Sequence, residues 1–174
     1  MANFLGTYTF DPNILFGEPS LTPLKIGWFT FVLMLIPGIW EEIAFRGVLF
    51  QLNMRKYSLK ITLILTSLLF GVAHFLNLIR GQSFSTTIMQ VIFAAFLGFL
   101  FGYMYLKTNS LLPSIITHYL IDTVGMLFMN AYFPNFINLN LFLIFGVGLI
   151  PTVFGLLFVK LVVRKLKDEE LKRK

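Results

Sequence analysis

The sequence contains no cysteine, which excludes disulfides, thiolate metal sites and cysteine nucleophiles. Charged residues are also few, at 13% of the 174 residues, and there are only two histidines. In contrast, 57% of the residues are hydrophobic and the mean hydropathy is +0.81, more than a soluble domain of this size requires. We therefore expect a lipid bilayer to surround most of this chain. A cleavable signal peptide is not expected, because residues 1–10 lack a basic stretch and an uninterrupted apolar core.

The basic residues are concentrated at one end of the sequence. The formal net charge is +6, and seven of the 14 lysines and arginines lie between residues 160 and 174. A basic tail that follows an apolar run typically contacts anionic lipid on the cytoplasmic side of a membrane. We therefore expect the lipid bilayer as a partner and no binding of nucleic acid.

Five hydrophobic stretches are long enough to cross a bilayer, which needs about 20 apolar residues. They cover residues 26–51, 60–79, 86–106, 110–129 and 139–163. Each should be a helix, because a membrane span must satisfy its own backbone hydrogen bonds and none of the stretches alternates like a strand. Short connections make sequential helices antiparallel neighbours. The sequence thus predicts an all-α, polytopic membrane bundle of about five transmembrane helices.

The chain divides into three predicted segments. Residues 1–25 are expected to be extracytoplasmic or interfacial, residues 26–163 to form the transmembrane domain, and residues 164–174 to form a basic cytoplasmic tail. When the loop at residues 52–59 is placed in the cytoplasm, eleven basic residues fall on that side and two fall outside. The predicted protein is therefore a multi-pass protein of the cell membrane, with its amino terminus outside and its carboxyl terminus in the cytoplasm.

A small set of ionisable residues lies deep inside the apolar stretches. A charge at the centre of a bilayer costs roughly 2.5 to 3.5 kcal/mol on insertion scales, so such residues usually serve a function. The set includes both histidines and comes from three different stretches. Its members are Glu41, Glu42, Arg46, His74, His118 and Asp122. We expect them to form one buried polar site assembled from several helices.

The first motif pairs two adjacent carboxylates with an arginine. Glu42 and Arg46 are four residues apart, with the acid on the amino-terminal side, which favours an ion pair on a helix. Glu41 is rotated by about 100° from Glu42, so it can face a cavity while Glu42 is occupied. A purely structural Glu–Arg pair is the alternative interpretation, but it leaves the second carboxylate unexplained.

The second motif places Phe70 and His74 on one helix face. A single histidine on an apolar helix is often only a hydrogen-bonded packing residue. Asn77, three residues further on, is a possible hydrogen-bond partner for His74.

The third motif places His118 and Asp122 on one helix face, four residues apart. The carboxylate can accept a hydrogen bond from the imidazole ring, or both groups can converge on a shared ligand. A proton relay or an ion site is the competing interpretation of an aspartate within the membrane.

Together, the motifs resemble the CPBP family of intramembrane proteases, which includes the type II CAAX prenyl endopeptidases and the bacterial Abi proteins. That family carries Glu-Glu-x-x-x-Arg, then Phe-x-x-x-His, then His-x-x-x-Asn or Asp on membrane helices. This chain carries the three patterns in the same order, at residues 41–46, 70–74 and 118–122. The resemblance extends over about residues 26 to 129.

The resemblance implies a glutamate-type hydrolase that needs no cofactor. By analogy, Glu41 would activate a water molecule together with His74, while Glu42 and Arg46 would support the site. His118 and Asp122 would stabilise the oxyanion. An ionised aspartate can only accept hydrogen bonds, so Asp122 is either protonated or holds His118 in a donating state. We favour the second interpretation.

A zinc site is a less favoured use of the same residues. Glu41, His74, His118 and Asp122 include the ligand types of catalytic zinc. However, the sequence has no His-Glu-x-x-His motif, and the resemblance implies catalysis without a metal.

The expected activity is cleavage of membrane-tethered, lipidated or hydrophobic peptides, with a role in peptide maturation or bacteriocin self-immunity. The alternative is a non-proteolytic immunity or transport protein that uses the buried charges for binding. A chain that needs further helices to be active is a third possibility. Gly98 and Gly102 form a small-xxx-small step that either packs helices together within the chain or joins two copies of it.

Overall fold

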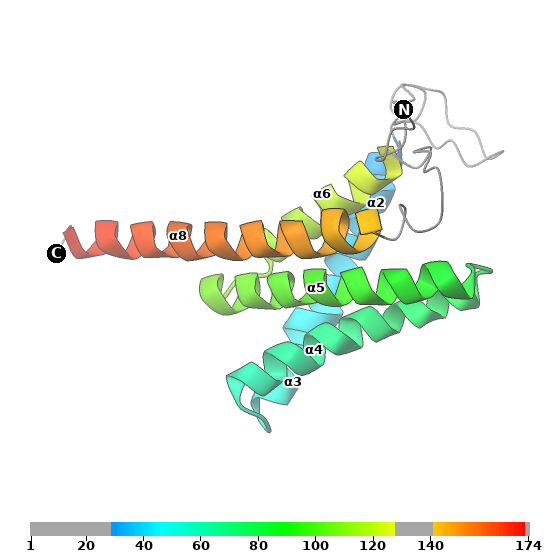
Figure 1. The fold of residues 1–174 in the computed structure, drawn as a ribbon. Helices are drawn as coiled ribbons and strands as arrows, with labels where there is room; N and C mark the ends of the chain where they lie inside the picture. The colour runs from blue at the N-terminus through cyan, green and yellow to red at the C-terminus, as the bar shows by residue number, and fades with distance from the viewer. Residues whose placement is uncertain (1–28, 128–140, 173–174) are drawn as a thin grey trace.

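The computed structural model describes residues 29–127 and 141–172, and these residues form five helical segments without a β-strand (Figure 1). Residues 1–25 and the connection before the last segment therefore lie outside the described part of the chain. The predicted all-α bundle is confirmed.

The first segment is one continuous helical column, in which α2 (Phe29–Glu42) continues into η1 (Ile43–Leu49) and then α3 (Phe50–Met54). The η1 part is π-helical, with a wider turn than an α-helix. Such turns inside α-helices frequently mark functional sites. Here the change of winding begins directly after Glu42, within the first motif.

The second and third segments are an antiparallel pair. α4 (Leu59–Ala73) ends in a short 3₁₀ turn, η2 (His74–Leu78), and α5 (Phe84–Thr108) returns beside it. The two helices approach closely at Gly71, where a Cβ atom would lie only 2.5 Å from the Val91 carbonyl oxygen. Gly98 and Gly102 also face α4, against Ser67 and Leu63. The small-xxx-small step thus packs α5 on α4 within one molecule.

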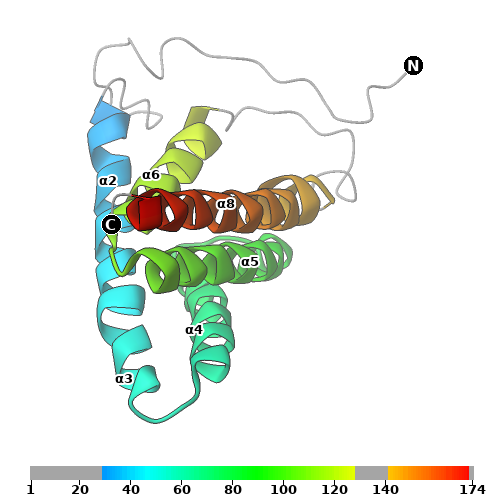
Figure 2. The ribbon, with the colours of Figure 1, turned by 90° about the vertical axis from the view of Figure 1, so that its left-hand side faces the viewer.

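The helix α5 lies at the centre of the molecule. Figure 2 shows α6 (Leu112–Leu127) beside the upper part of the α2–α3 column and α4 beside its lower part. α2 and α6 meet at Gly38, where a Cβ atom would lie 3.4 Å from the Tyr119 amide nitrogen. The last segment, η3 (Phe142–Leu149) and α8 (Ile150–Lys172), runs along α5. Most of the buried apolar core belongs to α5.

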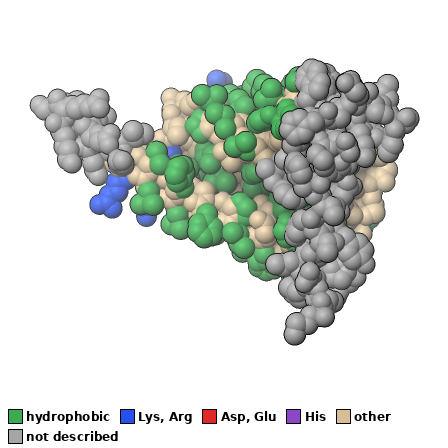
Figure 3. Space-filling view, turned by 90° about the horizontal axis from the view of Figure 1, so that it is seen from above, with side chains coloured by type: hydrophobic (Ala, Val, Ile, Leu, Met, Phe, Trp, Pro, Cys, Tyr) green, Lys and Arg blue, Asp and Glu red, His purple; other side chains and the backbone are tan. Residues whose placement is uncertain are grey.

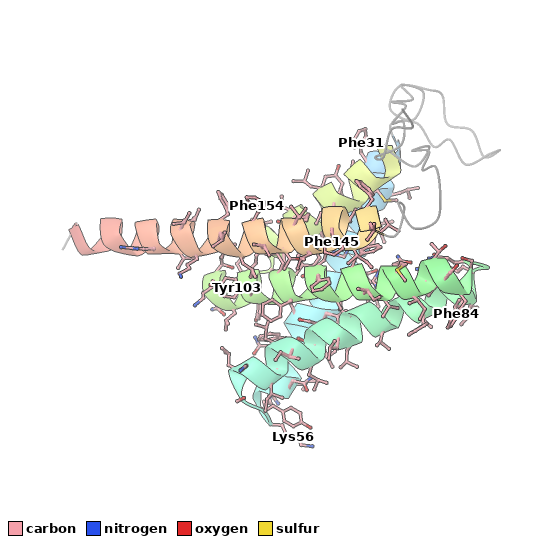
Figure 4. All side chains as sticks on the ribbon, viewed as in Figure 1. Phe31, Lys56, Phe84, Tyr103, Phe145 and Phe154 are labelled. Carbon is pink, nitrogen blue, oxygen red and sulfur yellow. The ribbon has the colours of Figure 1, made fainter. Side chains whose placement is uncertain are left out.

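Three helical stretches are long and apolar enough to cross a membrane, and they are Leu59–Leu78, Phe84–Thr108 and Phe142–Arg164. The other two segments are not among these stretches: the column from α2 to α3 carries the charged first motif, and α6 has 16 residues. Many large hydrophobic side chains are exposed on the outside: they are spread over the described part of the face in Figure 3, and Phe154 points away from the bundle in Figure 4. The protein is therefore an all-α membrane bundle.

Candidate active site

Glu42 and Arg46 form an ion pair at the buried end of the site. The exposed fraction of Glu42 is 0%, and Arg46 is similarly buried on the η1 turn. Arg46 Nη1 donates to Glu42 Oε1 at 2.7 Å, and Nη2 donates to the Gly98 carbonyl oxygen of α5 at 2.8 Å. The expected ion pair is thus present, and it also ties the first segment to α5. A charge-assisted pair of this kind fixes geometry as well as supplying energy.

His118, on α6, contacts the Glu42 carboxylate of this ion pair. Its Nδ1 lies 3.2 Å from Glu42 Oε1, the oxygen that also accepts from Arg46. One carboxylate therefore orients both a guanidinium on its own helix and an imidazole 76 residues away. The sequence predicted the first contact from helical spacing but gave no signal for the second.

Two further carboxylates face the other nitrogen of the His118 ring. His118 Nε2 lies 3.5 Å from Asp122 Oδ2 and 3.8 Å from Glu41 Oε2. The Glu41 and Asp122 side chains are 29% and 30% exposed, in contrast to the enclosed Glu42. The inner nitrogen thus meets a fully buried carboxylate, and the outer nitrogen meets two carboxylates that are open on one side.

Two phenylalanines enclose the charged groups. Phe101 of α5 stacks on the His118 ring, with centroids 5.0 Å apart and an interplanar angle of 23°. Phe70 of α4 presents its face to the Arg46 guanidinium, with Cζ 4.5 Å from the ring centroid. Aromatic faces attract cations through their quadrupole, most strongly where water is excluded. Phe70 belongs to the second motif, whereas Phe101 lies outside all three motifs and was missed by the sequence analysis.

His74 occupies the junction where α4 becomes the η2 turn. Its Nδ1 lies 3.0 Å from the Phe70 carbonyl oxygen. A carbonyl oxygen only accepts, so Nδ1 carries a proton and donates to it. The His74 ring also packs edge-on against Phe70, which in turn contacts His118. His74 is thus linked to the other motif residues through Phe70.

The predicted contact between His74 and Asn77 is wrong. Asn77 instead donates from Nδ2 to Gln90 Oε1 on α5, at 2.9 Å. The reason is that each side chain has another partner: His74 Nδ1 pairs with the Phe70 carbonyl oxygen, and η2 packs against α5, where Gln90 accepts from Asn77.

The structure joins five of the predicted residues in one network. Glu42 contacts Arg46 and His118, and His118 also contacts Glu41 and Asp122. His74 makes no hydrogen bond to these residues within the described part of the chain, and its ring contacts Phe70, which also packs against His118. Among the described residues, no group of three or more histidines and carboxylates is arranged as metal ligands. The zinc arrangement left open by the sequence is not formed by these side chains as they lie.

Comparison with known protein families places the chain as follows. The family model of the Rce1-like type II CAAX prenyl endopeptidases matches residues 23–124, which contain all three motifs. No curated protein and no solved structure matches the chain. Because the matched residues make up more than half of the chain, the protein belongs to the Rce1-like family of type II CAAX prenyl endopeptidases, whose general activity is that of an intramembrane endopeptidase.

Proposed function

We propose that the chain hydrolyses peptide bonds without a metal, using a water molecule activated by Glu41 and His74. The observation that carries this proposal is the convergence of Glu41 and Asp122 on the outer nitrogen of His118, while Glu42 holds the inner nitrogen. A half-exposed carboxylate above a fixed imidazole can serve as a general base next to an oxyanion donor.

In the first step, Glu41 accepts a proton from water while the lone pair on His74 Nε2 orients that water. The resulting hydroxide attacks the carbonyl carbon, and the carbonyl π electrons move to oxygen to form a tetrahedral oxyanion. When the C–N bond breaks, the leaving amine takes the proton held by Glu41. General base catalysis of this kind typically contributes 10²- to 10⁴-fold to the rate.

His118 supplies the oxyanion donor in this proposal. Its Nδ1 faces the Glu42 carboxylate, so Nδ1–H donates there and only a protonated Nε2 can donate to the oxyanion. His118 therefore acts as an imidazolium, and Asp122 stabilises that state from 3.5 Å. The Phe101 ring stacked on the imidazole favours the same charge state.

The proposed substrates are membrane-tethered or hydrophobic peptides. The site lies between helices whose outer surfaces are apolar, so a substrate reaches it most readily from the bilayer. The family's description names prenylated substrates. The biological role that we propose for this chain is peptide maturation or bacteriocin self-immunity.

We also propose that the amino terminus lies outside and the carboxyl terminus in the cytoplasm. Lys56 lies just before the start of α4, which packs beside the Tyr103 end of α5, whereas Phe84 lies at the opposite end of α5 (Figure 4). Lys107 packs by Tyr103, so it shares the basic end. Basic residues collected at one end favour a cytoplasmic location for that end.

The test is cleavage of a quenched-fluorescence peptide by purified protein in lipid nanodiscs. One hydrophobic peptide is supplied in a farnesylated and an unprenylated form, and each is incubated with and without a chelator. We expect cleavage of at least one form, unchanged by the chelator and absent from Glu41→Gln protein. Chelator inhibition reversed by zinc would overturn the metal-independent mechanism. If the effect of the protein in cells is unchanged by Glu41→Gln, the non-proteolytic immunity or transport function is favoured.

A further inference from the structure

Resting on the proposed function, we propose that Asn77, Gln82 and Gln90 form a subsite that binds the main chain of the peptide substrate, next to His74. We call these three residues the amide cluster. They come from η2, from the turn that follows it and from α5, and none of them belongs to the three motifs. The subsite binds the peptide backbone and does not discriminate between the side chains of the peptide.

The amide cluster is held together by a shared acceptor. Gln90 Oε1 accepts from Asn77 Nδ2 at 2.9 Å and from Gln82 Nε2 at 3.0 Å. All three side chains are half-buried. The cluster is therefore fixed in orientation before any ligand binds, which reduces the ordering cost of binding.

Three of the six polar side-chain atoms of the amide cluster have no hydrogen-bond partner within the described part of the chain. They are Gln90 Nε2, Asn77 Oδ1 and Gln82 Oε1. An unpaired, half-buried amide next to membrane-spanning helices is costly unless a ligand or water satisfies it. The free atoms are one donor and two acceptors, and an extended peptide presents the complementary C=O and N–H groups.

The position of the amide cluster follows from the winding of η2. In a 3₁₀ turn, residues three apart lie above one another on the same face, so Asn77 lies beyond His74 on the side that carries the catalytic ring. Three residues at about 2 Å each separate them by roughly 6 Å along the turn axis. An extended peptide advances about 3.3 Å per residue, so the amide cluster should bind the backbone about two residues from the scissile bond.

The experiment combines a change in the substrate with a change in the protein. A series of analogues of the cleaved peptide replaces one backbone N–H at a time by an ester oxygen, leaving the scissile bond intact. KM and kcat are measured in nanodiscs for wild type, for Gln90→Met and for Gln51→Met. Gln51 is the control because its amide pairs with Tyr105, and it belongs neither to the motifs nor to the amide cluster.

We expect one ester position, about two residues from the scissile bond, to raise the KM of wild type about 3- to 10-fold with little change in kcat. Gln90→Met should also raise KM, because it removes the shared acceptor that orients Asn77 and Gln82. Part of that loss should disappear at the same ester position, where no N–H remains for Asn77 Oδ1 or Gln82 Oε1 to accept. Gln51→Met should behave like wild type throughout.

Strictly additive effects of the protein change and the ester change on KM would overturn the subsite. It would also be overturned if Gln90→Met lowered only kcat and Tm, because that result indicates a structural role. If Gln90→Met does not fold, the ester series on wild type decides alone, since a flat series contradicts the proposal. If wild type cleaves nothing, the proposed function fails, and affinities of the ester series for Glu41→Gln protein, measured by fluorescence anisotropy, test the subsite separately.

Discussion

Glu42 Oε1 lies 3.2 Å from His118 Nδ1, although 76 residues separate the two in the sequence. The same oxygen accepts from Arg46, and Arg46 in turn binds the Gly98 carbonyl oxygen. Three helical segments thus meet at one buried carboxylate. The role of Glu42 in this account is to position His118, while the neighbouring Glu41 is left free to act on water.

Replacing Arg46 by leucine should destabilise the protein strongly. The change leaves Glu42 buried without its cation, and removing one partner of a buried ion pair typically costs about 3–5 kcal/mol. The measurement is the free energy of unfolding in mixed micelles. Arg55→Leu is the matched control, because Arg55 is exposed after α3 and should change stability by less than about 0.5 kcal/mol. Equal stability of the two variants would contradict the role given to Arg46.

Replacing Phe101 by leucine should slow cleavage about 10-fold while peptide affinity is retained. The stacked ring fixes the His118 plane, and aromatic pairs contribute about 0.5–1.5 kcal/mol beyond their buried area. The kcat and KM of the two proteins separate these effects. Phe158→Leu removes an exposed ring from α8 and serves as the control. An unchanged kcat in Phe101→Leu would show that the stack does not position the imidazole.

Replacing Gly71 by alanine should separate α4 from α5 and lower stability by about 1–3 kcal/mol. The added Cβ would lie 2.5 Å from the Val91 carbonyl oxygen, which is backbone and cannot move aside cheaply. Gly47→Ala is the control, since its Cβ would meet nothing closer than 3.6 Å. Thermal unfolding in nanodiscs compares the two, and a smaller loss for Gly71→Ala than for Gly47→Ala would contradict the close packing.

Replacing Asp122 by asparagine should preserve the fold and lower kcat at least about 10-fold, which corresponds to about 1.4 kcal/mol. The amide keeps the size of the side chain but removes the charge that stabilises the His118 imidazolium from 3.5 Å. The measurement is kcat together with Tm. Full activity with unchanged Tm would mean that an ionised Asp122 is not required.

Local features of the sequence predicted much of the fold. The expected spans at residues 60–79 and 86–106 differ by only a few residues from Leu59–Leu78 and Phe84–Thr108. The Glu42–Arg46 pair followed from its i, i+4 spacing, which the change to η1 winding did not disrupt. Apolar length and helical spacing are properties of short segments, so a single sequence records them directly.

The contacts that complete the site depend on how distant helices pack, and the sequence does not record this. His118 reaches Glu42 because α2 and α6 approach closely at Gly38. Phe101 enters the site because α5 lies at the centre of the bundle, yet as one of 21 phenylalanines it carried no signal of its own. The Asn77 side chain pairs with Gln90 because η2 packs against α5.

The most direct test of the catalytic role of Glu41 is the single-turnover cleavage rate of Glu41→Gln protein, measured beside its affinity for the same peptide. Glutamine keeps the shape of the side chain but cannot accept the proton from water. We predict a rate at least about 10²-fold below wild type with peptide affinity unchanged. Cleavage by Glu41→Gln at the wild-type rate would contradict the account, because another group would then have to activate the water.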